Sequence, residues 1–298
     1  MNNLESIIEE SAFKLIKVAE TILPDDVVEA LKKARDRETR PLAKAQLDAI
    51  LKNIEIAKNR KLPICQDTGT IIWFIKLGEN FPIRSKLKDI LIRATRRATE
   101  EIPIRPNAVN PWTGKNSGDN TGRYFPWFNW EIVQGDELEL TVLPKGGGSE
   151  NTSALWMLTP GEGINGLKRA VIETVYKAGP KPCPPIVVGV GIGGGADIAI
   201  KLAKKALLRP LNVRNEDENI AKLEEELLEA VNELGIGPMG LGGLTTVLDV
   251  HIEWGHRHPA SFPVGIVTQC WADRAARMRI TKDGKVEILS HNVNLEEV

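Results

Sequence analysis

The spacing of apolar residues divides the chain into a helical first part and a later part that mixes strands with helices. Apolar positions at helical intervals predict helices over residues 1–21, 27–37 and 41–60. Pro24 marks the end of the first helix and Pro41 begins the third. We expect these first 60 residues to form a structural layer, and the pattern assigns them no chemistry.

After residue 70 the pattern interleaves strands with helices. The expected elements, in chain order, are a strand at 71–78, a basic helix at 87–100, a hairpin at 132–143, a helix at 162–177, a buried strand at 185–190, helices at 196–207 and 216–233, and several strands between 244 and 287. Residues 103–129 hold too many prolines and glycines for regular structure, and a loop of that length is more often functional than not. This order predicts an α+β fold in which the helical N-terminal layer packs on a mixed β-sheet with interleaved helices, as a single large domain over residues 1–298.

Charge and apolar content narrow the class of protein. Thirty-nine basic and 40 acidic residues give a formal net charge of −1, which argues against nucleic acid or an anionic membrane as a partner. The first 21 residues carry four glutamates among their apolar positions, so they do not resemble a signal peptide. No apolar run approaches the ~18 residues of a spanning helix. We therefore expect a cytoplasmic protein.

Two glycine-rich turns are candidates for binding an anion. Residues 189–194 read GVGIGG between a predicted strand and a predicted helix, which matches the GxGxxG of dinucleotide-binding proteins. The second parallel strand, with an acidic residue about 20 positions further on, is not predicted, so close backbone packing or an anion site at the helix N-terminus better explains the three consecutive glycines at 193–195. Residues 145–151, KGGGSEN, form the other turn, which is either a nest of N–H groups for a carboxylate or phosphate, or a flexible loop.

Acidic and histidine side chains gather late in the chain. Asp249, His251 and Glu253 alternate on one face of a predicted strand, and His256 and His258 follow just beyond it. The spacing does not fit the HExxH motif of zinc hydrolases. We interpret these residues as the polar, solvent-facing edge of a strand, which leaves open that one of them reaches a site.

The chain has three cysteines, Cys65, Cys183 and Cys270. Their odd number and wide separation fit neither a disulfide framework nor a zinc ribbon, and a free cysteine is commonly a small buried apolar residue. Each of them, however, lies beside polar residues or prolines rather than within a regular apolar pattern. Three thiolates from three loops suit a [4Fe–4S] cluster with three protein ligands, because its fourth iron then stays open to act as a Lewis acid on a substrate.

Five ordered motifs carry a resemblance to a known family: PICQDTGT at 63–70, KGGGSEN at 145–151, KPCPP at 181–185, GIGGG at 191–195 and QCWADR at 269–274. Together they resemble the class I (iron–sulfur) fumarase and L-tartrate dehydratase family, and specifically the separate α subunit of its two-subunit members. The resemblance runs from about residue 6 to residue 289.

The resemblance implies roles for individual residues. It gives Cys65, Cys183 and Cys270 as the ligands of a [4Fe–4S] cluster with one open iron, and Asp67 as the residue that transfers a proton at the leaving or attacking oxygen. An alternative for Asp67 is an Asx-turn that leads into Thr68-Gly69. The implied substrate-binding residues are Gln66, Arg105, Gly147, Gly148 and His258.

The implied activity is reversible hydration of a small unsaturated dicarboxylate, with fumarate to (S)-malate as the first choice and dehydration of L(+)-tartrate to oxaloacetate as the alternative. Two other hypotheses are an NAD-dependent oxidoreductase built on the GxGxxG turn and a cluster-carrying subunit without catalysis of its own. The resemblance also implies a β subunit as partner, in a heterotetramer of two α and two β chains, because the motifs found here offer no base for the face of the substrate away from the iron.

Overall fold

In the computed structural model, which describes residues 3–296, the first 60 residues form the three expected helices. They are α1 (Asn3–Thr21), α2 (Asp25–Arg37) and α3 (Pro41–Arg60). Pro41 begins α3, a position where the missing N–H of proline costs nothing. No helix among residues 3–296 combines the length and the apolar content that crossing a membrane would require.

The contacts within the chain group its residues into two compact units. Unit 1 takes the described residues of 1–25, 53–146 and 274–298, and unit 2 takes residues 26–52 and 147–273. Helix α1 thus belongs to unit 1, α2 lies almost wholly in unit 2, and the boundary falls inside α3. The α+β class with mixed sheets is confirmed. The assignment of residues 1–298 to one domain stays a prediction.

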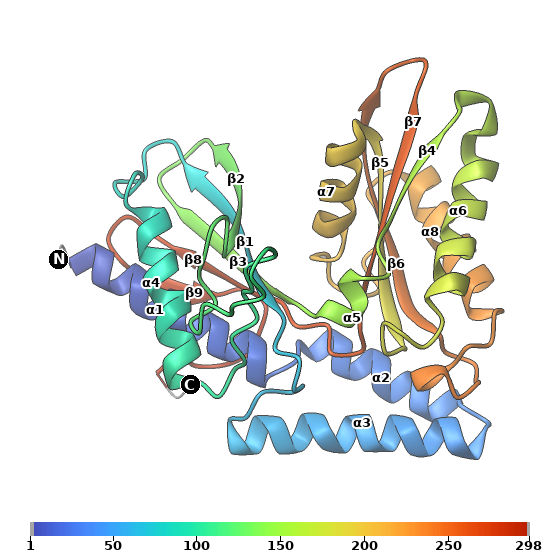
Figure 1. Ribbon diagram of the computed structural model, residues 1–298, viewed down its shortest axis with the longest axis horizontal. Helices are drawn as coiled ribbons and strands as arrows, with labels where there is room; N and C mark the ends of the chain where they lie inside the picture. Colours follow the sequence, from blue (N-terminus) through green and yellow to red (C-terminus); the bar gives the residue numbers. More distant parts are fainter. Residues whose placement is uncertain (1–2, 297–298) are drawn as a thin grey trace. The chain divides into compact units, whose positions relative to one another are not determined.

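Unit 1 is built on a five-stranded mixed sheet with the strand order β2-β1-β3-β8-β9. Helices α1 and α4 pack against each other, and α1 also packs on β3 and β8, so that their apolar faces and the sheet share one core (Figure 1). The elements are β1 (Thr70–Gly78), α4 (Leu87–Glu101), β2 (Trp127–Val133), β3 (Leu138–Lys145), β8 (Ala276–Ile280) and β9 (Val286–Ile288).

The hairpin predicted over residues 132–143 is wrong. Strands β2 and β3 do not pair; β1 lies between them, parallel to β2 and antiparallel to β3. The turn between β2 and β3 crosses the end of β1 instead, where the Gly78 N–H donates to the Glu137 carbonyl and the Asn80 N–H donates to the Gly135 carbonyl. A Cβ on Gly78 would come within 2.7 Å of the Gly135 oxygen, so the crossing needs glycine there. A short polar turn fits either arrangement, which is why the local pattern did not distinguish them.

Unit 2 is built on a four-stranded mixed sheet with the order β4-β7-β5-β6, in which β5 and β6 are parallel. Figure 1 shows α7 on one face of this sheet and α6 with α8 on the other. The elements are α5 (Gly147–Glu150), β4 (Ala154–Leu158), α6 (Gly163–Ala178), β5 (Ile186–Gly194), α7 (Ala196–Ala206), α8 (Glu218–Asn232), β6 (Val247–Arg257) and β7 (Phe262–Gln269), with short 3₁₀ turns at Pro160–Glu162 and Pro238–Gly240.

The GxGxxG glycines lie on the face of β5 that meets α7. A Cβ on Gly189 would be 2.1 Å from the Ala203 carbonyl oxygen, and one on Gly191 would be 2.0 Å from that of Ala199. The alternate residues of β5 point to the other face, into the core shared with α6 and α8. These two glycines therefore let the helix backbone approach the strand. The choice between close packing and an anion site at residues 193–195 stays a prediction.

Candidate functional site

Two of the three cysteines lie at one end of the unit 2 sheet. Cys183 precedes β5 and Cys270 follows β7, and these strands are antiparallel neighbours with Val187 opposite Gln269. The Trp271 N–H donates to the Cys183 carbonyl at 3.2 Å, so the two cysteine segments lie side by side. The sheet register thus brings together residues 87 positions apart in sequence.

The glycine-rich turn at 145–151 adjoins these cysteine segments. Gly147 and Gly148 are exposed in the first turn of α5, while Ser149 beside them is buried. The Thr268 hydroxyl donates to the Ser149 carbonyl at 3.1 Å, one residue before Gln269 and two before Cys270. A Cβ on Gly148 would be 3.0 Å from the Lys181 carbonyl oxygen. Unit 2 therefore gathers Gly147 and Gly148 with the segments that carry Cys183 and Cys270.

His258 does not join this group. It is exposed in the turn between β6 and β7, where the Ala260 N–H donates to its Nδ1 at 3.1 Å. Cys270 follows the opposite end of β7, and eight residues of extended strand span roughly 25 Å. Nearness in sequence suggested a shared site, but a strand carries the chain away from its starting point.

Unit 1 holds the other predicted residues, and Cys65, Gln66 and Asp67 lie on an irregular segment between α3 and β1. The Gly69 N–H donates to Asp67 Oδ1 at 3.0 Å, which is the Asx-turn considered as the alternative for this residue. Asp67 therefore shapes its own loop, and a role in proton transfer stays a prediction.

Arg105 comes from the long proline-rich and glycine-rich loop, and hydrogen bonds tie its backbone to the Asp67 loop. The Arg105 N–H donates to the Thr68 hydroxyl at 2.9 Å, and the Asn120 side chain donates to the Arg105 carbonyl at 2.8 Å. The Asn107 side chain donates to the Gly69 carbonyl at 2.8 Å. The guanidinium of Arg105 is left at the exposed surface. Unit 1 thus brings Arg105 together with the segment of Cys65, Gln66 and Asp67.

Sequence reasoning did not find the residues that make this connection. Thr68 and Asn120 are buried, at 2% and 3% exposure, and their side chains serve backbone groups of the Arg105 loop. Lys145, which pairs with Thr70 at the end of β3, is also buried, at 1%. The sequence signal that could have identified these residues is their position: Thr68 lies in the PICQDTGT motif, Lys145 begins KGGGSEN, and Asn120 lies in the long loop.

A buried ion pair beneath the Asp67 loop was also missed. Arg274 Nη1 donates to Glu20 Oε2 at 2.9 Å, and Arg274 Nη2 donates to the Asp67 carbonyl at 2.7 Å. The exposed fractions of the Arg274 and Glu20 side chains are 1% and 0%. Burial raises the pKa of Glu20 to about 7, against the opposing effect of the Arg274 charge.

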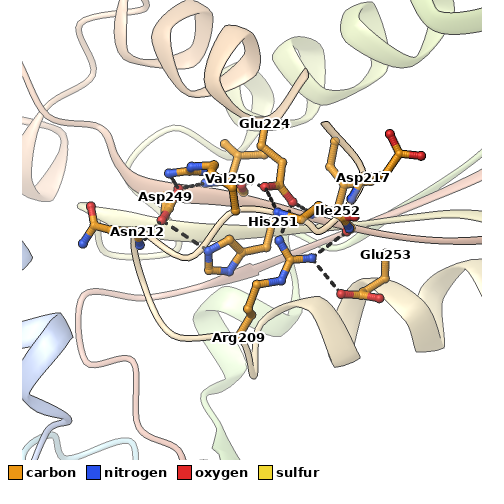
Figure 2. Close-up of polar contacts among 11 residues, drawn as sticks. Arg209, Asn212, Asp217, Glu224, Asp249, Val250, His251, Ile252 and Glu253 are labelled. Carbon is orange, nitrogen blue, oxygen red and sulfur yellow. Dashed lines mark hydrogen bonds and ion pairs between the residues drawn. The ribbon is translucent and has the colours of Figure 1, made fainter. Parts of the chain in front are cut away.

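The interpretation of this strand as solvent-facing is wrong for Asp249 and His251, whereas Glu253 is partly exposed. Strand β6 is an edge strand, but Asp249 and His251 are fully buried. Figure 2 shows what covers them: the segment after α7 and the side of α8 bring charged groups onto this face. Glu224, from α8, accepts hydrogen bonds from Arg209 at 2.6 Å and from the Ile252 N–H at 2.7 Å.

This cluster is paired internally. Arg209 also binds Glu253 at 2.7 Å (Figure 2), and Arg214 binds Asp249 at 2.6 Å. Burial alone would raise the pKa of Asp249, but hydrogen bonds from His251 and the Asn212 N–H, together with the charges of His251 and Arg214, lower it below its usual value. Opposite charges supplied by distant segments thus neutralise a strand that looked polar and exposed. The cluster fixes the segment after α7 to the sheet.

The cysteines have the properties that an iron–sulfur ligand set requires. None of the three forms a disulfide within residues 3–296, and all three are partly exposed and located on irregular segments, one in unit 1 and two in unit 2. The Cys270 thiol donates to the Ala272 carbonyl at 3.6 Å. Among residues 3–296, neither unit on its own gathers three or more His, Cys, Asp or Glu side chains that could hold a metal ion. The donor chemistry fits a cluster with three thiolate ligands.

Comparisons with known proteins place this geometry in context. Residues 9–279 match the family described as "Fumarate hydratase (Fumerase)". A Methanocaldococcus jannaschii protein named "Putative L(+)-tartrate dehydratase subunit alpha" is 50% identical over 283 residues, which cover 94% of this chain and 99% of that protein. The "L(+)-tartrate dehydratase subunit alpha" of Escherichia coli strain UTI89 is 41% identical over 272 residues, which cover 91% of this chain and 90% of that protein.

Proposed function

The chain belongs to the fumarate hydratase (fumerase) family of hydro-lyases, and we propose that it is the α subunit of an iron–sulfur hydro-lyase that dehydrates L(+)-tartrate to oxaloacetate. The observation that carries the choice of substrate is the 50% identity to the M. jannaschii protein, which extends over 99% of that relative and whose name specifies L(+)-tartrate. The motifs alone favoured fumarate. The names of the relatives favour the alternative.

A second candidate substrate is (S)-malate, with fumarate as the product, because the family description names that activity. Both reactions remove a hydroxyl from one carbon and a proton from its neighbour. In the tartrate reaction the product is an enol that converts to oxaloacetate. The two substrates differ by one hydroxyl, so the same carboxylate-binding residues serve either.

Under this proposal Cys65, Cys183 and Cys270 hold a [4Fe–4S] cluster. When bound, the cluster would supply a Lewis acid at an iron without a protein sulfur ligand, which lowers the cost of hydroxide departure. Support comes from the absence of a disulfide among the three cysteines within residues 3–296 and from the neighbouring positions of the Cys183 and Cys270 segments.

The remaining roles concern binding and proton transfer. Arg105 would bind one substrate carboxylate through its guanidinium fork, and the N–H groups at Gly147 or Gly148 would bind a carboxylate as well. Gln66 would orient the substrate, and Asp67 would deliver the proton that the departing hydroxyl needs. The hydrogen bonds between the Asp67 and Arg105 loops support this assignment. His258 stays a prediction that the geometry of unit 2 does not support.

The proposal includes a β subunit, because the relatives are named as α subunits. The base that removes the carbon-bound proton must act on the face of the substrate away from the iron, and we assign it to that partner, in an α2β2 assembly. Cytoplasmic location also stays a prediction.

The test is an anaerobic assay of the α chain with and without its β subunit. We expect the complex to form oxaloacetate from L(+)-tartrate with a higher kcat/KM than it shows for forming fumarate from (S)-malate. The α chain alone should turn over neither substrate at an enzyme-like rate. Cys65→Ser in the same complex is the matched control for activity that depends on the cluster.

The outcomes separate the candidates. Preference for (S)-malate would replace the tartrate proposal with the second candidate. Activity of the Cys65→Ser complex, or sustained turnover after removal of all iron, would overturn the iron–sulfur mechanism. Dehydration of neither substrate by an iron-loaded complex would overturn the proposed function itself, and an intact cluster without turnover would favour a subunit that carries a cluster without catalysis.

A further inference from the structure

The segment that carries Cys65, Gln66 and Asp67 has no regular structure of its own. It connects α3 to β1, and residues 62–69 belong to neither a helix nor a strand. The Asx-turn at Asp67 and Gly69 is local and does not anchor the segment to the rest of unit 1. Contacts from elsewhere in the unit must therefore determine where these three side chains point.

Glu20, in the last turn of α1, is connected to both ends of this segment. Its backbone carbonyl accepts a hydrogen bond from the Ile64 N–H at 2.9 Å. Its side chain binds Arg274, whose second guanidinium nitrogen donates to the Asp67 carbonyl at 2.7 Å. Cys65 and Gln66 lie between these two anchored residues, so one residue of a rigid helix constrains the segment on each side of the cysteine.

Burial makes this connection specific in geometry. A buried ion pair seldom stabilises a protein more than apolar side chains of the same size would, but losing one partner leaves an uncompensated buried charge. The planar guanidinium of Arg274 presents one nitrogen to the Glu20 carboxylate and another to the Asp67 carbonyl. A lysine ammonium at the same place has no such fork and cannot serve both acceptors with the same geometry.

We propose that Arg274, held by Glu20, is a positioning residue that fixes the backbone of residues 64–67 and so sets the directions of the Cys65 thiol and the Asp67 carboxyl group. Its importance for catalysis rests on the proposed function, because that function makes Cys65 a cluster ligand and Asp67 a proton donor. The positioning itself concerns the chain without any metal.

Arg274→Lys tests the proposal, because it keeps the charge opposite Glu20 and removes the second arm of the fork. The matched control is Arg209→Lys. Arg209 binds the Glu224 carboxylate and the Ile252 carbonyl at 2.6 and 2.7 Å, the same pattern of contacts in unit 2. Two measurements on the full-length, metal-free chain are decisive: the rate at which iodoacetamide alkylates each cysteine, resolved by peptide mass spectrometry, and amide hydrogen exchange in residues 62–69.

We expect Arg274→Lys to raise the alkylation rate of Cys65 and amide exchange in residues 62–69 by about tenfold or more, since a tenfold change corresponds to about 1.4 kcal/mol. Cys183 and Cys270 should change less than twofold. Arg209→Lys should lower the melting temperature about as much as Arg274→Lys does. It should leave the alkylation rate of Cys65 as in the wild type. Equal Cys65 reactivity in the wild type and Arg274→Lys, or equal increases in both variants, would overturn the proposal.

If Arg274→Lys does not fold, Glu20→Gln replaces it, because it keeps the shape of the side chain and removes the charge that holds Arg274. The same rise in Cys65 alkylation and in amide exchange of residues 62–69 is expected, and Cys65 reactivity equal to that of the wild type would overturn the proposal. In the assembled enzyme we expect Arg274→Lys to lower kcat more than it changes KM. Failure of the proposed function would appear as a lack of iron or turnover in the wild type, whereas these exchange and alkylation results do not depend on iron.

Discussion

Unit 1 and unit 2 hold their candidate site residues by different means. In unit 2 the backbone does most of this, because Cys183 and Cys270 stand at the ends of two paired strands and the ladder of β5 and β7 sets their positions. In unit 1 the residues lie on loops that side chains hold. Thr68 and Asn120 bind the Arg105 backbone, and Arg274 binds the Asp67 carbonyl across 207 positions of sequence.

The difference concerns how sensitive each group is to a single substitution. A strand ladder distributes its hydrogen bonds over many backbone groups, and changing one side chain removes none of them. A loop held by buried side chains loses its anchor when one of them changes, and a buried donor or acceptor without a partner costs about 1–3 kcal/mol. We therefore expect point substitutions to disturb the Cys65 segment more readily than the Cys183 and Cys270 segments.

The largest expected effect is the loss of cluster assembly and turnover, and it should be the same for the cysteines of both units. Because the chain has three cysteines and the proposed cluster uses all of them, Cys65→Ser, Cys183→Ser and Cys270→Ser should each abolish cluster assembly and turnover. Iron and acid-labile sulfide content, with EPR of the anaerobically reconstituted and reduced protein, measure this directly. Circular dichroism would show that each variant remains folded. Any variant with full iron and full turnover removes its cysteine from the ligand set.

The next effect separates two roles of one residue in unit 1. Asp67→Asn keeps an oxygen that can accept the Gly69 N–H, so the Asx-turn survives while the ionisable group is lost. We expect the cluster to assemble normally and kcat to fall by roughly 10²–10⁴, the usual contribution of a general acid or base. Asp89→Asn, at an exposed position of α4 in the same unit, is the control. A normal kcat in Asp67→Asn would show that Asp67 forms the Asx-turn and does not transfer a proton.

A smaller effect is expected in the buried charge cluster of unit 2. Glu224 is fully buried and binds Arg209 and the Ile252 N–H, so Glu224→Gln removes the buried counter-ion of Arg209 and leaves it only the partly exposed Glu253. We expect the free energy of unfolding to fall by about 3 kcal/mol or more. Chemical denaturation measures it, with the exposed Glu225→Gln as control. Alkylation rates of Cys183 and Cys270 should not change, since the sheet holds them; a tenfold increase would contradict the contrast between the units.

The same contrast explains what the sequence could and could not predict. Helices and strands followed apolar periodicity, and their bounds came within a few residues, as for α3 and β1. Pairing was harder: the turn between β2 and β3 fits a hairpin equally well, and only the position of β1 decides against it. The burial of Asp249 and His251 depends on Arg214 and Glu224, which a strand pattern does not contain.

Within the site, motifs identified the candidate residues but not what holds them. Cys65, Cys183 and Cys270 stood out because of their polar surroundings, whereas Glu20 looked like an ordinary acidic residue of an amphipathic helix. Its partner Arg274 lies 254 positions away, and no local pattern connects the two. Closeness in sequence is also a poor guide to closeness in space, because His258 precedes β7 whereas Cys270 follows it, and the role of His258 stays a prediction.

The smallest expected effect is a pH dependence within the side-chain network of unit 1. Burial opposes ionisation of Asp119, but hydrogen bonds from Arg96 and Thr121 outweigh it and lower the pKa of Asp119 to about 2. A carboxyl group with a lowered folded-state pKa stabilises the protein above its unfolded pKa, and this contribution is lost as pH falls through the folded pKa. The shift corresponds to at most about 2.4 kcal/mol, and because the Arg96 side chain is 48% exposed, solvent screening reduces our expectation to about 1 kcal/mol.

Asp119→Asn measures this contribution. The difference in unfolding free energy between the wild type and Asp119→Asn should be largest near pH 6 and should shrink as the pH falls from about 4 towards 2. Denaturant titrations of the metal-free chain at several pH values provide the measurement. Asp119 adjoins Asn120, whose side chain holds the Arg105 carbonyl, so the protection of residues 104–108 against hydrogen exchange, corrected for the intrinsic rate at each pH, should fall over the same pH window. A stability difference that does not vary with pH would mean that Asp119 contributes through its size and hydrogen-bonding geometry and not through its charge. The position of the Arg105 loop in unit 1 would then not depend on the ionised Asp119 carboxylate.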